Sequence, residues 1–581
     1  MDGKEANQMS KQANIGLSFG SMMQPPLDLA KSPRFRIALM GDFSGRAAKG
    51  EVEIGADLAK RRPIKLDVDT LDKVIAGFAT TLVLPIGKKG QGIEVELSSI
   101  DDLHPDELFE KVEMFAELVA LTRRLASGAT AKGAVTELRE WGQAFGKKVN
   151  PPARTSAGNA VPADRKLSDF AKLVGGTITR KATASPADEL LQRIVGPYIQ
   201  ALPDPNAAAM QEAVEESLAG AMRLVLHHPE FQSVEAQWRM LDLITRSVET
   251  DAKLDIVLYD ISAEELAADL AAQDDLTQSG FCELLVEGTP DGRGRFSAVC
   301  GFYTFEETPP HAELLGRIAK VCAHVNAPFL AAISTGFMEV PKDERHPLVA
   351  EAWDALRALP EAGYVGLTSP RFLLRRPYGA KSEPIYEFEF EEFTESEGLS
   401  GMLWANPVAL VVILLARSFR KTGPSLGLGQ VMSLGEIPFH YVKDRYGDQV
   451  ALPCTERNLT QTRTQAAIAR GLMPVVSVKG RDEVRLASFQ SLAGSTVLGP
   501  WSDVPPPKPK EEPPRRVEEE ASDDSSSDDS DAGASDDAVD DDLAALLAGF
   551  DTETPDEDTS SESSGDEDEM DADLAALLAS L

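Results

Sequence analysis

The chain is 581 residues long, 43% of its residues are hydrophobic, and its formal net charge is −36. A length prior gives about three or four structural units. The charge is uneven: 28 acidic and 4 basic residues follow Trp501, so this tail carries −24 and residues 1–501 carry −12. An acidic chain lacks the basic face that binds phosphate, which excludes nucleic acid as the expected partner.

The sequence also indicates a compartment. No apolar run approaches the roughly 20 residues that span a bilayer, and the start MDGKEANQMSKQ lacks the basic and then apolar plan of a signal peptide. The four cysteines show no CxxC pairing and lie mostly in apolar runs: Cys282, Cys300, Cys322 and Cys454. We expect them to be small buried residues in a reducing compartment. These features predict a cytoplasmic protein without direct membrane insertion.

Residues 1–33 are polar and aperiodic, and they predict a flexible arm. The run RFRIALMGDFSGR at 34–46 then alternates apolar with other residues and predicts a strand that ends in a glycine turn. Glycines followed by Arg46 raise the possibility of a phosphate loop. The GxxxxGK[ST] spacing is absent, so nucleotide binding is not predicted.

From Ile64 to Leu125 the predicted order is strand, helix, strand, helix. The strands are expected near Ile64 and Val95, and the first helix is DTLDKVIAGF. The long second helix, DELFEKVEMFAELVALTRRL, follows a capping sequence at 101–105. Its buried side is expected to hold five residues at helical spacing: Phe109, Val112, Phe115, Leu118 and either Leu121 or Leu125. Residues 143–186 then have the Pro, Ala, Thr and Lys content of a linker.

Two amphipathic helices are predicted to meet at His227-His228-Pro229. Apolar residues recur at helical spacing before and after this break: Val214, Leu218, Met222 and Val225, then Phe231, Val234, Trp238, Leu241 and Ile244. Pro229 suits a first helical turn, since proline has no amide hydrogen to leave unpaired. Adjacent histidines could hold a metal, but no third ligand stands at a suitable spacing, so capping and core packing are favoured. Trp238 with Arg239 predicts a buried ring followed by a charge that leaves the core.

The part of the chain after this break alternates predicted strands with predicted helices, which favours a layered α/β core with mixed α+β character. KLDIVLYDIS and APFLAAIS predict strands, while AEELAADL and HAELLGRIAKVCAHV predict helices. Tyr386, Phe388 and Phe390 alternate with glutamates and predict a strand with one apolar and one acidic face. LWANPVALVVILLARSF at 403–419 predicts a buried helix.

Three arginines, Arg371, Arg375 and Arg376, are concentrated among apolar residues and two prolines. An anion-binding enzyme site is one interpretation of this cluster. The favoured interpretation is that the arginines pair with carboxylates across subunit contacts.

The tail at 501–581 is predicted to be disordered, because an Asp/Ser/Glu tract cannot bury enough apolar surface to fold. Within it the phrase DLAALLA occurs twice, at 542–548 and at 573–579. Each copy predicts a two-turn amphipathic helix with three leucines on one side: Leu543, Leu546 and Leu547, or Leu574, Leu577 and Leu578. Such helices are too short to be stable alone, so they are interpreted as motifs that fold into a groove on a partner. Local helicity without a partner is the alternative.

The region of the helix break resembles the large subunit of the type VI secretion contractile sheath, through Leu226-His-His-Pro-Glu-Phe-Gln and Glu235-Ala-x-Trp-Arg239. The likeness continues through GLTSPRFLLRRPYG at 366–379 and Leu403-Trp404-x-Asn406. Residues 34–142 resemble the small subunit of the same sheath, with GDFSGR near the start and Asp-Asp-x-His-Pro-Asp before a long helix. The two subunits are usually separate chains, so the resemblance implies a fusion of a small-subunit-like domain (34–142) with a large-subunit-like domain (187–500).

The resemblance implies a structural subunit and not an enzyme, with no cofactor, metal or catalytic residue. Copies of the chain would stack as six-membered rings around an Hcp-like inner tube, joined to a baseplate, and contract to deliver effectors. Eleven residues are assigned to structural or interface positions of the family pattern: His228, Pro229, Phe231, Gln232, Trp238, Arg239, Pro370, Arg371, Arg375, Tyr378 and Trp404. A sheath-derived scaffold that does not contract is the alternative. A soluble α/β enzyme is a further alternative that lacks a recognisable catalytic motif.

In that family, neighbouring protomers share a sheet built by strand exchange from subunit termini and a large-subunit hairpin. We expect the linker at 143–186 to let strands on both sides of it reach different neighbours. The family's contracted sheath is recycled by an AAA+ unfoldase that grips the N-terminal helix of the large subunit, which is internal here, at 187–202. We therefore expect the tail motifs to replace that helix as a recognition handle, or else to bind the baseplate or a regulator.

Overall fold

The structure is a computed structural model that describes residues 17–27, 34–86, 91–125, 160–162, 207–287, 295–338, 344–394, 398–443 and 448–508, with short pieces at 133–134, 136–137, 147–148 and 340. The chain divides into two units, and all described residues lie in the first, which runs from Met1 to Pro509. Most of the predicted linker, the expected helix at 187–202 and both tail motifs lie outside the described residues.

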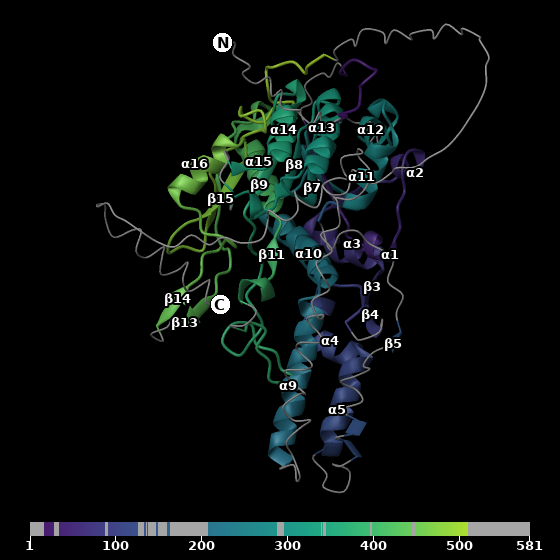
Figure 1. Ribbon diagram of the computed structural model, residues 1–581, viewed down its shortest axis with the longest axis vertical. Helices are drawn as coiled ribbons and strands as arrows, with labels where there is room; N and C mark the ends of the chain where they lie inside the picture. Colours follow the sequence, from purple (N-terminus) through teal and green to yellow (C-terminus); the bar gives the residue numbers. More distant parts are fainter. Residues whose placement is uncertain are drawn as a thin grey trace, which may run out of the picture. The chain divides into compact units, whose positions relative to one another are not determined.

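A nine-stranded sheet forms the centre of this unit (Figure 1). Its six central strands are parallel, and antiparallel strands close both edges. In spatial order the strands are β12 (Ser433–Leu434), β16 (Val484–Leu486), β15 (Met473–Ser477), β9 (Val365–Ser369), β8 (Phe329–Ile333), β7 (Ala298–Phe305), β1 (Phe35–Gly41), β6 (Leu254–Asp260) and β2 (Ile64–Leu66). The predicted mixture of helices and strands is confirmed.

Strand β1 comes from the N-terminal part of the chain, yet it lies between β7 and β6 in the sheet. All seven of its residues are buried, as is typical of a parallel strand that is covered on both faces. Arg36 is tolerated there because its guanidinium pairs with Asp255 of β6 at 3.1 Å. The N-terminal part and the part after the helix break therefore build one sheet.

Helices cover both faces of the sheet. On one face, α10 (Pro229–Ser247) and α15 (Val408–Thr422) share a core cluster with Phe35, Ile37 and Leu39 of β1. On the other face, Ala38 and Met40 of β1 belong to a second cluster. This second cluster includes residues of α11 (Ala263–Ala272), α12 (Gly280–Glu287), α13 (Pro309–His324) and α14 (Pro347–Arg357). The alternation of apolar side chains along β1 thus divides the core into two layers.

The N-terminal part also forms α3 (Leu71–Phe78) and a three-stranded antiparallel sheet of β3 (Thr80–Leu84), β4 (Gln91–Leu97) and β5 (Lys147–Lys148). Strand β3 was not predicted as a separate strand. The single long helix predicted after it is two helices in the structure, α4 (Pro105–Lys111) and α5 (Glu113–Leu125). Val112 takes an extended conformation between them and stays buried. Helix α5 packs against α9 (Ala207–Leu226).

The predicted strand at 386–390 is wrong. The main-chain amides of Tyr386 and Glu387 donate to the carboxylate of Asp106 on α4, at 3.1 to 3.2 Å, and not to a neighbouring strand. The side chains do not form one apolar face either, since Tyr386 is 84% exposed while Phe390 is buried. The carboxylate of Asp106 on α4 accepts the main-chain hydrogen bonds that the carbonyls of a neighbouring strand would otherwise accept.

Part of the expected arm, residues 17–27, runs over α13 and the chain before η4 (Leu276–Gln278). The Ser21 amide donates to the Asp274 carbonyl at 2.9 Å, and the Leu27 amide donates to the His324 carbonyl at 3.1 Å. Phe19 lies directly over Gly316 of α13, where a larger residue would overlap its ring.

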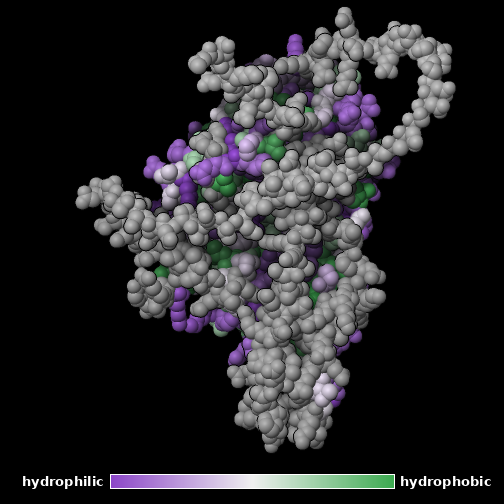
Figure 2. All heavy atoms as spheres, viewed as in Figure 1, coloured by the Kyte–Doolittle hydropathy of each residue, from purple (hydrophilic) through white to green (hydrophobic). Residues whose placement is uncertain are grey.

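Shorter elements complete the described part of the chain: α1 (Arg46–Lys49), α2 (Ala56–Ala59), α16 (Gln461–Ala469), β10 (Phe372–Leu373), β11 (Trp404–Ala405), β13 (Tyr441–Lys443) and β14 (Gln449–Ala451). All four cysteines are free and buried. No helix among the described residues combines the length and the apolar character needed to cross a bilayer. In Figure 2 the coloured residues are mostly polar, with small separate apolar spots.

Candidate functional site: two joints and a groove

The predicted helix break lies where the sequence placed it. Helix α9 ends at Leu226 and α10 begins at Pro229, with the side chain of His228 accepting a hydrogen bond from the Glu230 amide at 3.3 Å. Burial lowers the pKa of His228 to about 4, so the ring stays neutral and can accept that bond. The capping interpretation is confirmed, and the described residues hold no cluster that could bind a metal ion.

A first joint, here called the loop joint, fixes the turn after β1 to α10 and to the end of β6. Trp238 is fully buried and its indole N–H donates to the Phe43 carbonyl at 2.9 Å, while the Gln237 amide group donates to the Asp42 carbonyl at 2.8 Å. Asp260 of β6 accepts from the Phe43 amide at 2.8 Å and from the Ser44 hydroxyl at 2.6 Å. The GDFSGR turn is thereby held mainly through its backbone.

Charged groups complete the loop joint. Glu265 of α11 is fully buried and accepts from Arg46 at 3.1 Å and from Arg61 at 2.6 Å. Burial alone would raise the pKa of Glu265, but the hydrogen bonds from Arg61 and Arg46 outweigh it and lower the pKa. For Asp260, burial prevails over the hydrogen bonds from Ser44 and raises the pKa. Arg46, the cation that the phosphate-loop interpretation would need, is already paired with Glu265, and the Phe43 and Ser44 amides already donate to Asp260.

A second joint, here called the arginine joint, is centred on Arg375. Its Nε donates to Glu235 of α10 at 2.7 Å, and its two Nη atoms donate to Glu392 at 2.6 and 2.8 Å. The guanidinium lies 4.2 Å from the centre of the Tyr378 ring. Burial would raise the pKa of Glu392, yet the Arg375 charge lowers it to about 2. The joint therefore holds the Arg375 cation between the carboxylates of Glu235 and Glu392.

Further contacts connect the arginine joint to the N-terminal part of the chain. Arg239 donates to the Tyr378 hydroxyl at 2.9 Å and to Glu235 at 2.8 Å. The Tyr378 ring meets the His104 ring edge-on at 5.0 Å, and His104 is the residue that caps α4. Together with the hydrogen bonds that Asp106 accepts from Tyr386 and Glu387, these contacts place α4 against the 378–392 segment.

The pairing of the arginines across subunit contacts needs correction. Arg375 pairs with Glu235 and Glu392 of the same chain, and Arg371 pairs with Glu456 of the same chain at 2.6 Å. The Arg376 guanidinium lies 6.0 Å from the centre of the Phe439 ring. The sequence could indicate that carboxylates would meet these arginines but not which ones.

The remaining predicted positions lie in the interior or beside it. Phe231 is fully buried, and Gln232 continues α10 with its amide donating to the His228 carbonyl at 2.9 Å. Pro370 is buried and follows a cis peptide bond. Trp404 pairs with Leu373 between β11 and β10, and its indole N–H donates to the Leu399 carbonyl at 3.0 Å.

Four carboxylates of the two joints were not predicted from the sequence: Glu235, Glu265 and Glu392, which are buried, and Asp260, which is partly buried. Two of them carried a usable signal. Glu235 stands inside an apolar helical face next to Val234, and Glu265 is three residues from Ser262 in a capping box. A carboxylate in such a position needs a cation or several donors.

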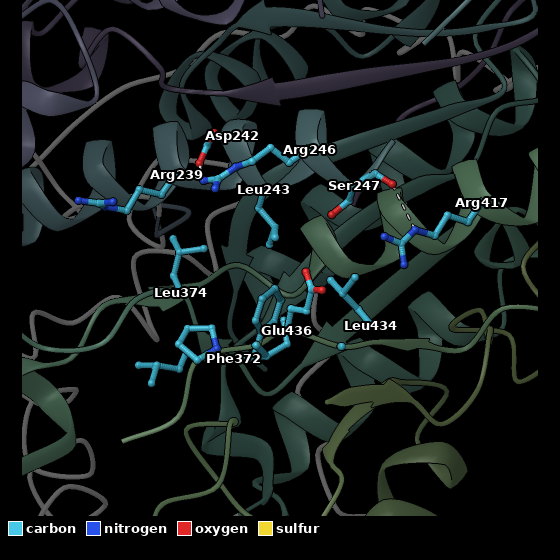
Figure 3. Close-up of a pocket in the computed structure, with 14 residues that line it drawn as sticks. Arg239, Asp242, Leu243, Arg246, Ser247, Phe372, Leu374, Arg417, Leu434 and Glu436 are labelled. Atoms are coloured by element: carbon cyan, nitrogen blue, oxygen red, sulfur yellow. Dashed lines mark hydrogen bonds and ion pairs between the residues drawn. The ribbon is translucent and has the colours of Figure 1, made fainter. Parts of the chain in front are cut away.

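A groove lies beside the arginine joint, between the second half of α10, α15 and the segments at 372–374 and 434–438 (Figure 3). Its volume is about 460 Å³. Its lining combines apolar side chains, including Leu243 and Phe372, with the arginines Arg239, Arg246 and Arg417. Arg239 is thus shared between the groove and the arginine joint.

Comparisons with known proteins match two separate parts of the chain to two families. Residues 31–141 match the model of the VipA family of the type VI secretion system, and residues 208–493 match the model of the VipB (EvpB-type) tail sheath N-terminal domain. The chain joins a VipA-type sheath domain to a VipB-type sheath domain. The VipA-type domain supplies β1, the GDFSGR turn and α4, and the VipB-type domain supplies α10 and Arg375. The predicted fusion is confirmed.

A curated relative supports the second match. Over 299 residues the chain is 33% identical to the type VI secretion system sheath protein TssC1 of Pseudomonas aeruginosa. The alignment covers 48% of this chain and 60% of that relative, so the chain spans less than two thirds of its length. The two joints described above are therefore contacts within and between sheath-family domains.

Proposed function

We propose that this chain is a structural subunit of the contractile sheath of a type VI secretion system, and that a single chain is a complete protomer. What carries the proposal is the succession of a VipA-type and a VipB-type domain in one polypeptide. The shared sheet and the two joints support it, because a wall unit that shifts as a rigid body needs its domains fixed to one another.

In the proposed assembly, copies form six-membered rings that stack helically around an Hcp-like inner tube and are attached to a baseplate. Contacts that repeat head to tail without closing produce an open helix, so one kind of chain is sufficient. Contraction then drives the tube and its effectors outward. Because the helix that the family's AAA+ unfoldase grips is internal here, at 187–202, any recycling by such an unfoldase is assigned to the tail motifs as the recognition handle. The role is structural, and no catalytic step is assigned to it.

The β13–β14 hairpin supports strand exchange between copies. The Leu452 amide donates to the His440 carbonyl at 2.8 Å, and the next pair is Tyr441 with Ala451. Hydrogen-bonded and non-hydrogen-bonded pairs alternate in an antiparallel ladder, so the amide of Ala451 faces away from β13. The hairpin is a two-stranded sheet among the described residues, and an added strand would find a donor there.

Negative-stain electron microscopy of the chain co-expressed with an inner tube protein tests the proposal. We expect long tubules with a cogwheel cross-section. Tubules that form but never change length would favour the non-contractile scaffold. Discrete particles, or turnover of a small molecule by the purified chain, would reject the proposal.

A proline variant tests the strand-exchange step separately. Ala451→Pro removes an outward-facing amide while the hairpin keeps its own hydrogen bonds, so we expect a folded protein that no longer forms tubules. Ala451→Val keeps the amide and serves as the matched control. Tubules from Ala451→Pro at the wild-type level would show that this edge of the hairpin is not used.

A further inference from the structure

The groove between α10 and α15 is lined by apolar side chains and by charged side chains. Of this lining, Arg239 also belongs to the arginine joint. Apolar side chains from three elements line it: Leu243, Phe372, Leu374, Leu434 and Ile437. Among them Leu243 and Leu374 are only partly buried within the chain. A groove of this size and character can accept a short apolar helix face.

The charged lining has three arginines and two carboxylates, an excess of one positive charge. Arg239, Arg246 and Arg417 stand against Asp242 and Glu436. Asp242 is already paired with Arg246 one turn away on α10, and the Arg246 side chain is still 70% exposed. Arg417 donates through Nε to the Ser247 carbonyl at 3.2 Å, as the dashed line in Figure 3 marks. In a chain with a net charge of −36, this is a local excess of positive charge that favours an acidic partner.

The rim of the groove contains an unusual backbone conformation. Glu436 has a φ of 63°, in the left-handed region that disfavours a residue with a side chain. It is also exposed, so burial of its own side chain does not explain its position. Strained positions of this kind are found preferentially at binding sites.

The tail of the chain offers segments of matching chemistry. Three aspartates at 540–542 directly precede Leu543, Leu546 and Leu547, so an acidic cluster lies at one end of an apolar helix face. The second motif has the same order, with Asp571 and Asp573 before its leucines. A cationic rim beside an apolar lining is complementary to both features.

We propose that this groove binds the DLAALLA motif of a second copy of the chain. Each chain carries two motifs for one such groove, which leaves motifs available to other copies. The 33 residues at 509–541 separate the first motif from the last described residue, and a chain of this length spans on the order of 30 Å or more. Tails would then cross-link copies, with two weak motifs per tail adding avidity. The inference goes beyond the proposed function and does not depend on contraction.

Peptide binding tests the groove. The probe is a fluorescein-labelled peptide of residues 537–550, titrated with a full-length chain in which Leu546→Asp and Leu577→Asp remove the competing motifs. We expect saturable binding that Arg246→Glu weakens by about tenfold and that Glu436→Lys strengthens, because the two substitutions change the rim charge in opposite directions. Arg246 and Glu436 are both exposed, so neither change should prevent folding.

Controls separate this site from unspecific attraction. Arg463→Glu changes an exposed arginine of α16 that does not line the groove, and it should leave the affinity unchanged. A peptide with Leu543, Leu546 and Leu547 replaced by aspartate should not bind. Absence of binding by the unaltered peptide, or equal loss with Arg463→Glu and Arg246→Glu, would overturn the proposal.

A mixing experiment tests whether a second copy is the source. One full-length chain carries Arg246→Glu with an intact tail, and the other carries an intact groove with Leu546→Asp and Leu577→Asp. Both chains also carry Ala451→Pro, so that assembly into tubules does not bring the fluorophores together. We expect energy transfer between fluorophores on the two chains, and loss of that signal when both chains carry Arg246→Glu. If the peptide binds but the mixed chains give no such signal, the groove takes the motif of its own chain or a different acidic partner, and the assignment to a second copy is wrong.

Discussion

At the loop joint, side chains of α10 bind main-chain atoms of the VipA-type domain, whereas at the arginine joint side-chain charges bind one another. Trp238 and Gln237 reach the carbonyls of Phe43 and Asp42, which no substitution at those positions removes. Arg375 instead depends on the carboxylates of Glu235 and Glu392, each replaceable by a single mutation. The loop joint holds the main chain of the turn at Asp42 and Phe43. The arginine joint holds a set of side chains, and it needs every one of them.

The largest effect is expected at the arginine joint. Arg375→Ala leaves Glu392 buried without its arginine and Glu235 with Arg239 alone, which costs about 3–5 kcal/mol. Urea unfolding of the unassembled chain measures this loss. Arg371→Ala is the matched control, because its ion pair with Glu456 is on the surface and its side chain is 50% exposed, so the loss should stay below about 1 kcal/mol. Equal losses from both substitutions would contradict the difference between a buried and a surface arginine.

A smaller effect is expected at the loop joint. Trp238→Phe keeps an aromatic ring but leaves the Phe43 carbonyl without its indole donor in a buried site, which costs about 1–3 kcal/mol. The same unfolding experiment measures it. Because the turn keeps its bonds to Asp260, we also expect proteolysis within residues 41–46 to stay slow in this variant. Rapid cleavage there would mean that Trp238 alone holds the turn.

Mild acid should act on the start of α10 before it acts on the arginine joint. The unfolded His228 binds a proton below pH 6.5, but the folded ring does so only near its pKa of about 4. Stability should therefore fall as the pH drops from about 6.5 to 4. His228→Asn keeps a helix cap without a titrating group, so the slope of unfolding free energy against pH should become shallower in that window.

Below that window the arginine joint is expected to respond. The pKa of Glu392 is about 2 in the folded protein and lies near 4.5 without its neighbours. A carboxyl group with a lowered folded pKa stabilises the fold above pH 4.5, and this contribution is lost as the pH falls toward 2. If His228→Asn left the slope of unfolding free energy against pH unchanged between pH 6.5 and 4, the assignment of that upper window to His228 would be wrong.

The smallest effect is expected at the groove. Glu436 takes a left-handed conformation with φ of 63°, which glycine adopts without steric cost. We expect Glu436→Gly to stabilise the chain by about 0.5–1 kcal/mol, less than either joint contributes. Thermal unfolding of the variant measures this gain. A loss of stability would mean that the Glu436 side chain makes a contribution that exceeds the relief of strain.

Local features of the fold could be predicted from the sequence. The break at His228-Pro229, the strand β1, the buried α15 and the burial of Trp238 each follow from a periodic pattern or a capping residue within a few positions. Such signals are contained in the segment itself.

Features that depend on distant partners could not be predicted in the same way. The 386–390 run alternates as a strand does, but Asp106 takes its amide hydrogen bonds and Arg375 takes the nearby Glu392. The insertion of β1 between β7 and β6 likewise depends on residues that follow it far along the chain. For Arg371 and Arg375 the predicted carboxylate partners were correct in kind, but these partners lie in the same chain and not in another subunit.

We propose that one chain contains a whole sheath protomer. Electron cryomicroscopy of the chain expressed without any other sheath protein tests this proposal. We expect helical tubules in which every repeating unit contains both the VipA-type and the VipB-type domain, with β1 inside the sheet of the VipB-type domain. A chain that remains a compact monomer under all assembly conditions, or tubules that require a separate small subunit, would contradict it.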